Sequence, residues 1–575
     1  LEYYIGNFNM GILFKRKIVV KGNISSSSVW MRVFAWFGIV QFSLSAALGL
    51  VLLYSFDQVK YQNPPFGLAI FDIVGKTVES VGQYRFSPIR MLGYNPDFPV
   101  LNLEVKQKNF RKMEHAVETD KAVNEGVRRE TKVKANLRID GSIVPVKIRI
   151  KGHRKIHWAE SDNWSYRVEV KGSNTVLGMK RFSLHRPVTK NYIHEWIFHK
   201  MLKAEGVIGL RYQFVTLKIN GKNMGVYAFE EHFDKRLIEN NGRRDGPILK
   251  AGYPLSENSW RTIGVYESKR WEEESPGIMS QATLQMQRFQ TGELSVDDVF
   301  DVELLGRYMA VCELLNTWHG ALFKSVKFYY NPITQKLEPV GIDGHQLGIT
   351  TDVISSDRGP LPIANKGAWH RALFDKDLTE NSKFLEAFGR NLERLSKTTY
   401  LDDFFGGVQP ELDRNLDFLY SDVPFVDLWA FGALGSKHQG AKGATGLLFS
   451  YSPSDQQIRQ SYLRKRLSPD PFIDGYVIQK TKDGVQVTVR NRQSLPIEYG
   501  KFYIAGRVYI PTSKSTLQGI GTSQTGLWTK IEYGVTEQPS VDDIHSSKNG
   551  FLYRVLGAVE WNEKAFSHAY VSNGS

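Results

Sequence analysis

The chain has 575 residues, which at roughly 100–200 residues per domain predicts two to four domains. Hydrophobic residues make up 42% and aromatic residues 12%, which excludes wholesale disorder, and the mean hydropathy of −0.32 excludes a polytopic membrane protein. Lys and Arg total 74 against 60 Asp and Glu, and this net charge of +14 allows anionic partners without selecting one. The one cysteine, Cys312, excludes an intramolecular disulfide, a four-cysteine zinc site and a cysteine-ligated iron–sulfur cluster.

The first feature along the chain is an uncharged segment from Val33 to Phe56. Its 24 residues include no Asp, Glu, Lys or Arg and would span ~36 Å as a helix, against a hydrocarbon core of ~30 Å. A buried core helix and a cleaved signal peptide are the alternatives, but the apolar region of a signal peptide has only about 7–15 residues. The segment therefore predicts a single transmembrane helix.

The charges on either side of this segment predict its orientation. Five cations precede it and two follow closely: Lys15, Arg16, Lys17, Lys21 and Arg32 before, Lys60 and Lys76 after. Because flanking Lys and Arg favour the cytoplasmic side, we expect a cytoplasmic amino terminus and extracytoplasmic main domains.

Composition and hydrophobic period divide the chain into five predicted regions. They are a cytoplasmic segment (1–32), the transmembrane helix (33–56), a membrane-proximal connector (57–95), a main α+β domain (96–471) and a β-sandwich-like module (472–575). The connector has Pro64-Pro65 and no firm period, whereas the last region alternates apolar and polar residues after Asp483-Gly484.

Short strands with a period of two begin near residue 100 of the main domain. Residues 143–151 alternate apolar side chains with Lys147, Arg149 and Lys151, after a turn at Asp140-Gly141. Further strands are predicted at 166–171, 180–185, 212–219 and 225–230. Together they predict a lobe built on a mostly antiparallel sheet.

Segments with the hydrophobic repeat of a helix lie between these strands and after them. Residues 193–204 place apolar side chains on one face of a helix that Gly206 stops, and residues 301–315 do the same around Cys312. A hairpin is predicted from 327–330 and 337–342, and helical patterns resume around 382–420. The fold class is therefore α+β, with a sheet lobe and a helical lobe.

This order of elements, ending its hairpin at Asp343, is that of a protein-kinase-like fold. Phosphoryl transfer needs cations near the triphosphate, oxygen ligands for Mg²⁺ and a group that accepts the hydroxyl proton. Arg149 and Lys151 share one strand face, and Asp343 precedes Gly344, so the chain can turn there and offer the carboxylate to a metal. The alternative is that the two cations form a solvated face and that Asp343 only forms a turn.

Particular motifs resemble the spore coat protein H (CotH) kinase family over roughly residues 100–370. Residues 146–153, VKIRIKGH, are similar to the family's R-x-(R/K)-G opening. Residues 182–185, the helix with Glu195 and Trp196, and the block 214–231 look like its middle part, while residues 337–343, LEPVGID, are similar to its metal-binding segment.

The resemblance implies an atypical kinase fold that binds ATP and Mg²⁺ and phosphorylates hydroxyl groups of proteins or other surface polymers. It implies that Asp343 binds the metal and that Arg149 and Lys151 lie near the nucleotide. It also implies that Glu230 or Glu231 lines the nucleotide side of the sheet.

The loop at 316–326, NTWHGALFKSV, departs from the family pattern of an Asp followed about five residues later by an Asn. His319 stands at the Asp position, and Lys324 or the proposed metal ligand Ser325 at the Asn position. A histidine can accept a hydroxyl proton near neutral pH, so His319 and the neighbouring Asn316 are the candidate catalytic residues. Two hypotheses stay open: an extracytoplasmic, membrane-anchored kinase, and a non-catalytic pseudokinase-like scaffold or binding protein of the cell envelope.

Other ligand classes are weaker hypotheses. Five histidines (His153, His157, His185, His194 and His199) allow a zinc site, but their spacing favours structural roles. Nucleic-acid binding is disfavoured because the basic residues are dispersed and the main domains are predicted to lie outside the membrane.

Overall fold

The computed structural model describes residues 97–123, 130–152, 155–158, 163–251, 263–321, 325–344, 381–422, 453–467, 473–491, 497–498, 502–504, 507–513, 516–517 and 528–536. The predicted regions 1–32, 33–56 and 57–95 lie outside these residues. Within the described part of the chain, no helix has both the length and the apolarity needed to cross a bilayer.

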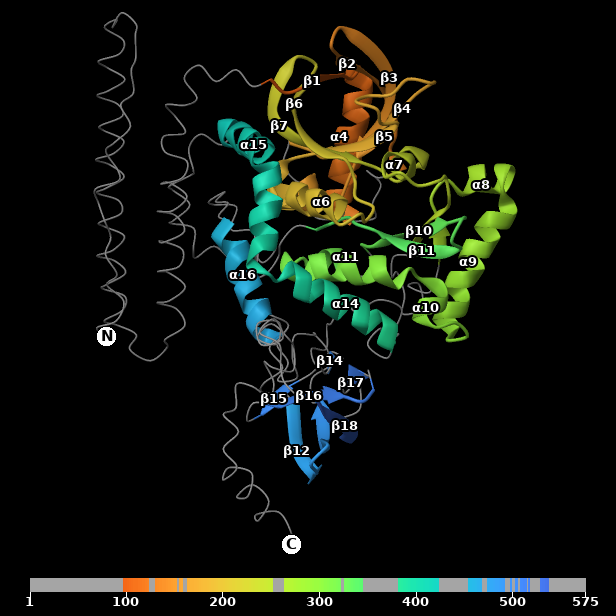
Figure 1. Ribbon diagram of the computed structural model, residues 1–575. Helices are drawn as coiled ribbons and strands as arrows, with labels where there is room; N and C mark the ends of the chain where they lie inside the picture. The colour runs from red at the N-terminus through yellow and green to blue at the C-terminus, as the bar shows by residue number, and fades with distance from the viewer. Residues whose placement is uncertain are drawn as a thin grey trace, which may run out of the picture. The chain divides into compact units, whose positions relative to one another are not determined.

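The first seven strands form a closed barrel (Figure 1) in the order β1-β2-β3-β4-β5-β7-β6. The strands are β1 Val100–Glu104, β2 Val133–Ile139, β3 Ser142–Ile150, β4 Tyr166–Val170, β5 Arg181–His185, β6 Tyr212–Ile219 and β7 Lys222–Glu231. All neighbours pair antiparallel except β1 and β6, which run parallel from Val100 opposite Thr216 to Leu103 opposite Ile219. The predicted antiparallel sheet is thus corrected to a barrel, because a period of two shows which residues are buried but not which strand closes the sheet.

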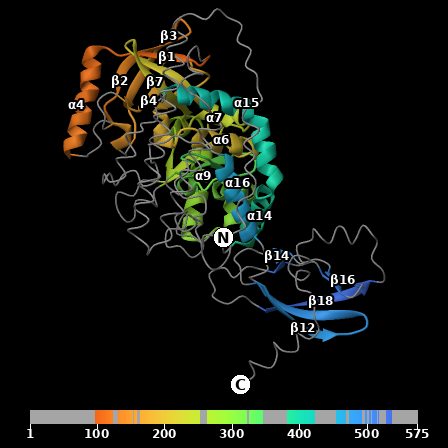
Figure 2. The same ribbon diagram turned by 90° about the vertical axis from the view of Figure 1, so that its left-hand side faces the viewer.

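Alternate side chains of these strands fill the barrel interior. One buried cluster includes Ile148, Val168, Leu184 and Phe229, and every strand contributes to it at every second position. The helix α4 Gln107–Val123, which the sequence analysis missed, packs against β2 (Figure 2). The apolar face of α4 is narrow, so the helical repeat of hydrophobic residues is weak in the sequence.

A second buried cluster joins the outer face of β6 and β7 to the helical part. It includes Phe214 and Ala228 from the strands, Trp196 and Phe198 from α6 His194–Ala204, and Leu305 from α11 Val302–Leu314. In Figure 1, α6 accordingly lies between the barrel and the helices α11 and α14.

The remaining elements of the main domain pack on this second cluster or on a smaller one that includes Leu237, Ile248 and Tyr329. A four-stranded sheet has the order β11-β10-β8-β9, and several helices flank it. Their bounds are α7 Lys235–Asn240, β8 Ile248–Ala251, β9 Ile263–Val265, α8 Ser268–Glu274, α9 Pro276–Thr291, α10 Val296–Val299, α12 Trp318–Ala321, β10 Lys327–Asn331, β11 Lys336–Val340, α14 Ser382–Leu395, α15 Thr398–Asp422 and α16 Pro453–Arg466.

One buried ion pair fixes α16 to the end of α11. Arg459, with a side chain 1% exposed, donates from Nε to the carbonyl of Glu313 at 2.9 Å and from Nη2 to its carboxylate at 3.0 Å. The guanidinium therefore donates hydrogen bonds both to a carbonyl group in the last turn of α11 and to a buried carboxylate.

The carboxy-terminal strands form an antiparallel sheet in the order β12-β13-β18-β16-β15 and a two-stranded sheet of β14 and β17. Their bounds are β12 Ile473–Lys480, β13 Gly484–Asn491, β14 Ile497–Glu498, β15 Phe502–Ile504, β16 Arg507–Pro511, β17 Thr516–Leu517 and β18 Trp528–Thr536. That these sheets pack as a separate sandwich-like module stays a prediction.

Candidate functional site

A row of polar residues crosses four neighbouring strands on the outer face of the barrel. Arg149 of β3 lies opposite Arg167 of β4, Arg167 opposite Ser183 of β5, and Ser183 opposite Glu230 of β7. Their neighbours along the strands belong to the cluster inside the barrel, so these four share the face that is turned outward. These neighbours are Ile148, Ile150, Tyr166, Val168, Phe182, Leu184 and Phe229. We call Arg149, Arg167, Ser183 and Glu230 the polar row.

Glu230 at one end of the row pairs with Lys151. The Lys151 Nζ forms an ion pair with the Glu230 carboxylate, and their side chains are 16% and 1% exposed. Ser183 Oγ donates to the same carboxylate at 3.1 Å. Burial opposes ionisation of Glu230, but the charges of Lys151 and Lys190 outweigh it and hold the pKa of this carboxyl well below its usual range.

Lys190, which the sequence analysis missed, connects the polar row to the segment after β11. It ends a short 3₁₀ helix, Pro187–Lys190, that follows β5, and it is buried. Its Nζ pairs with Asp343 and lies 3.4 Å from Glu230 Oε1 and 3.7 Å from Glu195 Oε1. One ammonium group thus faces three carboxylates from three different elements.

Burial and charge act in opposite directions on the two lysines. For Lys190, burial disfavours the charged form, but Asp343, Glu195 and Glu230 outweigh it and raise the pKa above the usual value. For Lys151, burial prevails over the attraction of Glu230, and together with Arg167 and Lys190 it lowers the pKa to about 8. Lys190 is therefore a fixed cation, whereas Lys151 titrates at mildly alkaline pH.

The structure brings Asp343 together with two other predicted site residues. Ser325 Oγ donates to Asp343 Oδ2 at 3.4 Å, and His319 Nδ1 lies 3.9 Å from the same oxygen. His319 belongs to α12, which follows α11 after a short segment that contains Asn316. The candidate proton acceptor and metal ligands therefore share one site.

The backbone around the site is unusual for residues other than glycine. Asp343 has φ 61° and Asn316 has φ 54°, in the left-handed region that costs energy for most side chains. Gly344 packs so closely on α6 that an added Cβ would overlap the ring of Phe198. The glycine after Asp343 therefore lets the metal-binding segment lie directly on α6.

Glu230 and Glu231 lie on opposite faces of β7. Glu231 accepts a hydrogen bond from the Arg211 backbone amide at 3.0 Å and forms an ion pair with the Arg211 guanidinium. Of the two predicted glutamates, only Glu230 contacts the Lys151 and Lys190 side chains.

The donor set around Asp343 fits one Mg²⁺ ion. Mg²⁺ is usually held by one or two carboxylates, with phosphate and water oxygens completing six ligands, and Asp343 and Ser325 could supply two positions. No group of three or more His, Cys, Asp or Glu side chains able to hold a metal occurs among the described residues. The residues thus fit a metal that phosphate oxygens help to bind, while the nearby Glu195 and Glu230 carboxylates face the Lys190 ammonium.

The histidines have separate partners. His157 Nδ1 contacts Ser165 Oγ at 2.9 Å, His185 Nδ1 contacts Thr189 Oγ1 at 2.8 Å, and His199 Nε2 lies 3.3 Å from Glu195. His153 lies outside the described residues. These contacts favour structural roles over a shared zinc ion.

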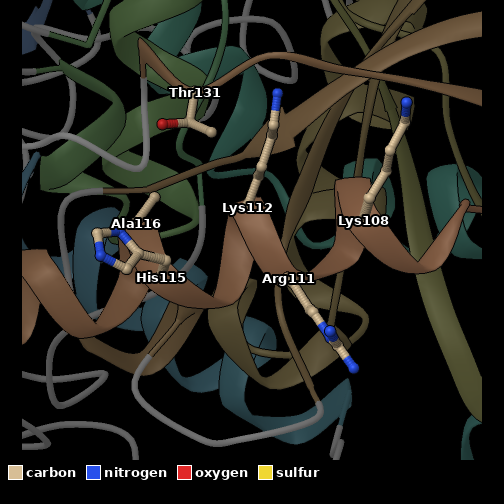
Figure 3. Close-up of a pocket in the computed structure, with 6 residues that line it drawn as sticks. All are labelled: Lys108, Arg111, Lys112, His115, Ala116 and Thr131. Carbon is tan, nitrogen blue, oxygen red and sulfur yellow. The ribbon is translucent and has the colours of Figure 1, made fainter.

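A separate basic hollow of about 380 Å³ lies on α4 and contains none of the predicted site residues. Its lining comprises Lys108, Arg111, Lys112, His115, Ala116 and Thr131. In Figure 3 the amino groups of Lys108 and Lys112 extend to one side of the helix and Arg111 to the other. These exposed cations provide matched controls for charge changes in the site.

Comparison with known proteins gives one family match. Residues 148–403 match the family model described as CotH kinase protein, a range that includes the polar row, Lys190, His319 and Asp343. No curated protein matches the chain.

Proposed function

The chain belongs to the CotH kinase family through residues 148–403, and on that premise we propose that it binds ATP with Mg²⁺ and phosphorylates hydroxyl groups. The observation that supports this most is the position of Lys190. Through this one side chain, the Lys151–Glu230 pair on the barrel meets Asp343 from the hairpin of β10 and β11. Cations for phosphate and a carboxylate for metal therefore occur side by side, as phosphoryl transfer requires.

Each residue has a distinct role in this proposal. Arg149 and Lys151 bind the phosphates, and Glu230 holds the Lys151 ammonium in place. Asp343 and Ser325 would hold a Mg²⁺ ion, which neutralises charge on the phosphate oxygens when bound. Lys190 forms an ion pair with Asp343 and places a positive charge beside the metal-binding carboxylate.

His319 is the proposed proton acceptor, since it lies beside Asp343. As the acceptor oxygen bonds to the terminal phosphorus of ATP, the bond between that phosphorus and its bridging oxygen breaks, and ADP leaves. The hydroxyl proton passes to the His319 imidazole, which the nearby Asp343 carboxylate stabilises once it is protonated.

The proposed acceptors are hydroxyl groups of proteins or surface polymers at the cell envelope. This location rests on the uncharged segment 33–56 and on the cations before it. Protease added to intact cells should digest the main domains; their full protection behind a sealed membrane would refute the orientation.

The central experiment measures binding and transfer by the full chain. We expect Mg·ATP binding by calorimetry and transfer of the terminal phosphate from labelled ATP to a hydroxyl-bearing protein. Asp343→Asn should remove the gain in affinity that Mg²⁺ provides while leaving the fold intact, as circular dichroism would show. A variant that binds Mg·ATP as well as the parent would remove Asp343 from the site.

A pseudokinase-like scaffold is the second candidate, and the Lys190–Asp343 ion pair favours it. A cation already bound to the metal ligand competes with Mg²⁺, and α12 carries a histidine in place of an acidic residue. Binding of nucleotide without any transfer would support this candidate over the enzyme.

A further inference from the structure

Arg167, within the polar row, is half-buried, and part of its guanidinium group has no hydrogen-bond partner in the described structure. In the described part of the chain, its Nε and Nη1 are buried without a hydrogen-bond partner. Burying such groups without partners costs free energy, and more so when they carry charge. The arrangement therefore lowers stability unless another molecule supplies acceptors.

The surroundings of Arg167 add to this cost. Arg149 lies directly opposite it on the neighbouring strand, and like charges in that position repel. Burial, together with Arg149 and Arg181, prevails over the attraction of Glu230 and lowers the pKa of Arg167 to about 10. Two adjacent arginines on one sheet face provide a geometry that suits an anion.

A second buried group without a partner lies near the same cations. The Nδ1 of His232, just beyond β7, is buried and lacks a hydrogen-bond partner in the described structure. Burial and the charges of Arg167, Lys151 and Arg181 hold the pKa of His232 well below its usual range, so the ring is neutral. A neutral imidazole can donate a hydrogen bond to a phosphate oxygen without adding charge.

We propose that Arg167, together with Arg149 and Lys151, forms a phosphate-binding subsite that holds the nucleotide without a divalent cation. The inference rests on the proposed nucleotide site. It adds Arg167 to the phosphate-binding residues and assigns neutralisation of the phosphate charge to side chains rather than to a metal. Arginine binds phosphate in a bidentate manner, which would satisfy the buried nitrogens. Since Asp343, the proposed metal ligand, already forms an ion pair with Lys190, the three cations rather than a metal neutralise the phosphates.

The test measures ATP and inorganic tripolyphosphate binding by the full chain, in EDTA and in excess Mg²⁺. We expect the parent to bind both ligands in EDTA and Arg167→Gln to bind them about 10- to 100-fold more weakly, the usual effect of one charge-assisted contact. Arg167→Lys should recover part of the loss. Arg111→Gln on α4 makes the same charge change at an exposed position and should bind like the parent.

A stability readout separates this role from a structural one. If Arg167 serves the ligand, Arg167→Leu should bind weakly yet melt at the same or a higher temperature, because it removes an unsatisfied buried cation. A lower melting temperature together with unchanged affinity would overturn the inference.

The other outcomes are equally decisive. ATP binding in Mg²⁺ but not in EDTA overturns the inference and leaves the proposed function intact. No binding under either condition overturns both. If tripolyphosphate fails to compete with ATP, or if Arg111→Gln weakens binding as much as Arg167→Gln, the phosphate subsite is refuted.

Discussion

The ammonium group of Lys190 forms an ion pair with the carboxylate of Asp343, although 153 positions separate the two residues in the chain. Lys190 follows a barrel strand, whereas Asp343 follows the hairpin of β10 and β11. The pair therefore links the two parts of the kinase domain at the point where the candidate nucleotide and metal residues meet.

Lys190→Ala should destabilise the protein by about 3–5 kcal/mol, because it leaves the carboxylates of Asp343 and Glu195 without their nearest fixed cation. Urea denaturation measures the change in the free energy of unfolding. Lys121→Ala, which removes an exposed pair with Glu118, should cost under about 1 kcal/mol. Equal losses for the two variants would contradict the central role of Lys190.

His319→Ala should reduce phosphoryl transfer by about 10²- to 10⁴-fold, the usual contribution of a general base. Transfer of labelled phosphate measures the rate, and ATP affinity should stay unchanged. An active parent that is indifferent to this substitution would show that His319 is not the base. Asn316 would be tested next as a group that orients the hydroxyl, since its amide does not accept a proton. If the parent is inactive, His319→Asp combined with Ser325→Asn restores the family pattern and should create transfer.

Nucleotide affinity should fall as the pH rises above about 8, because Lys151 then loses the proton that its phosphate contact needs. Titrations between pH 7 and pH 10 measure the effect, and Lys151→Arg should abolish it, since arginine stays protonated throughout. The free energy of unfolding should change with pH in the opposite direction from nucleotide affinity. Between about pH 8 and the usual lysine pKa the unfolded chain binds more protons at this residue, so the contribution of Lys151 to stability increases with pH.

A constant affinity for the parent over this range would mean that Lys151 does not contact the ligand. A Lys151→Arg variant that loses affinity as steeply as the parent would assign the pH dependence to another group.

Gly344→Ala should destabilise the protein by about 1–3 kcal/mol, because the new methyl group overlaps the ring of Phe198 and displaces the neighbouring Asp343. Thermal and urea unfolding measure the cost, and a Phe198→Ala background should reduce it. Gly407→Ala in α15 is the matched control. Nothing lies within 4 Å of the added methyl group there, and alanine favours the helix. A Gly344→Ala variant as stable as this control would show that the close packing on α6 is not required.

The alternation of apolar and polar residues predicted most strands of the barrel, but it did not predict that the barrel closes. The run at 143–151 alternates clearly, and it forms β3 with buried residues at every second position. Parallel pairing of β1 with β6 depends on long-range packing, which no local pattern records. The family resemblance was confirmed for residues 148–403, because several motifs in a fixed order carry more information than any one of them.

The site was harder to predict because its key contacts are buried and distant in sequence. Because successive residues of a strand lie on opposite faces, the sequence places Glu230 and Glu231 on different faces of β7. Only the position of α6 shows which face belongs to the site. Lys190 lies in a single 3₁₀ turn without a period, and Arg167 looks like a solvated position in an alternating run. The one available signal was the repetition of arginine at facing positions of two successive strands.

The Arg459–Glu313 ion pair has a practical consequence for defining an independently folding fragment. The family match ends at residue 403, but Arg459 lies beyond it and holds the end of α11, from which the His319 loop departs. A chain truncated at residue 403 would lack Arg459 and therefore both of its hydrogen bonds to Glu313 at the end of α11. Expression of the kinase domain therefore needs the sequence through α16, and a shorter product that failed to bind nucleotide would report on the truncation rather than on the site.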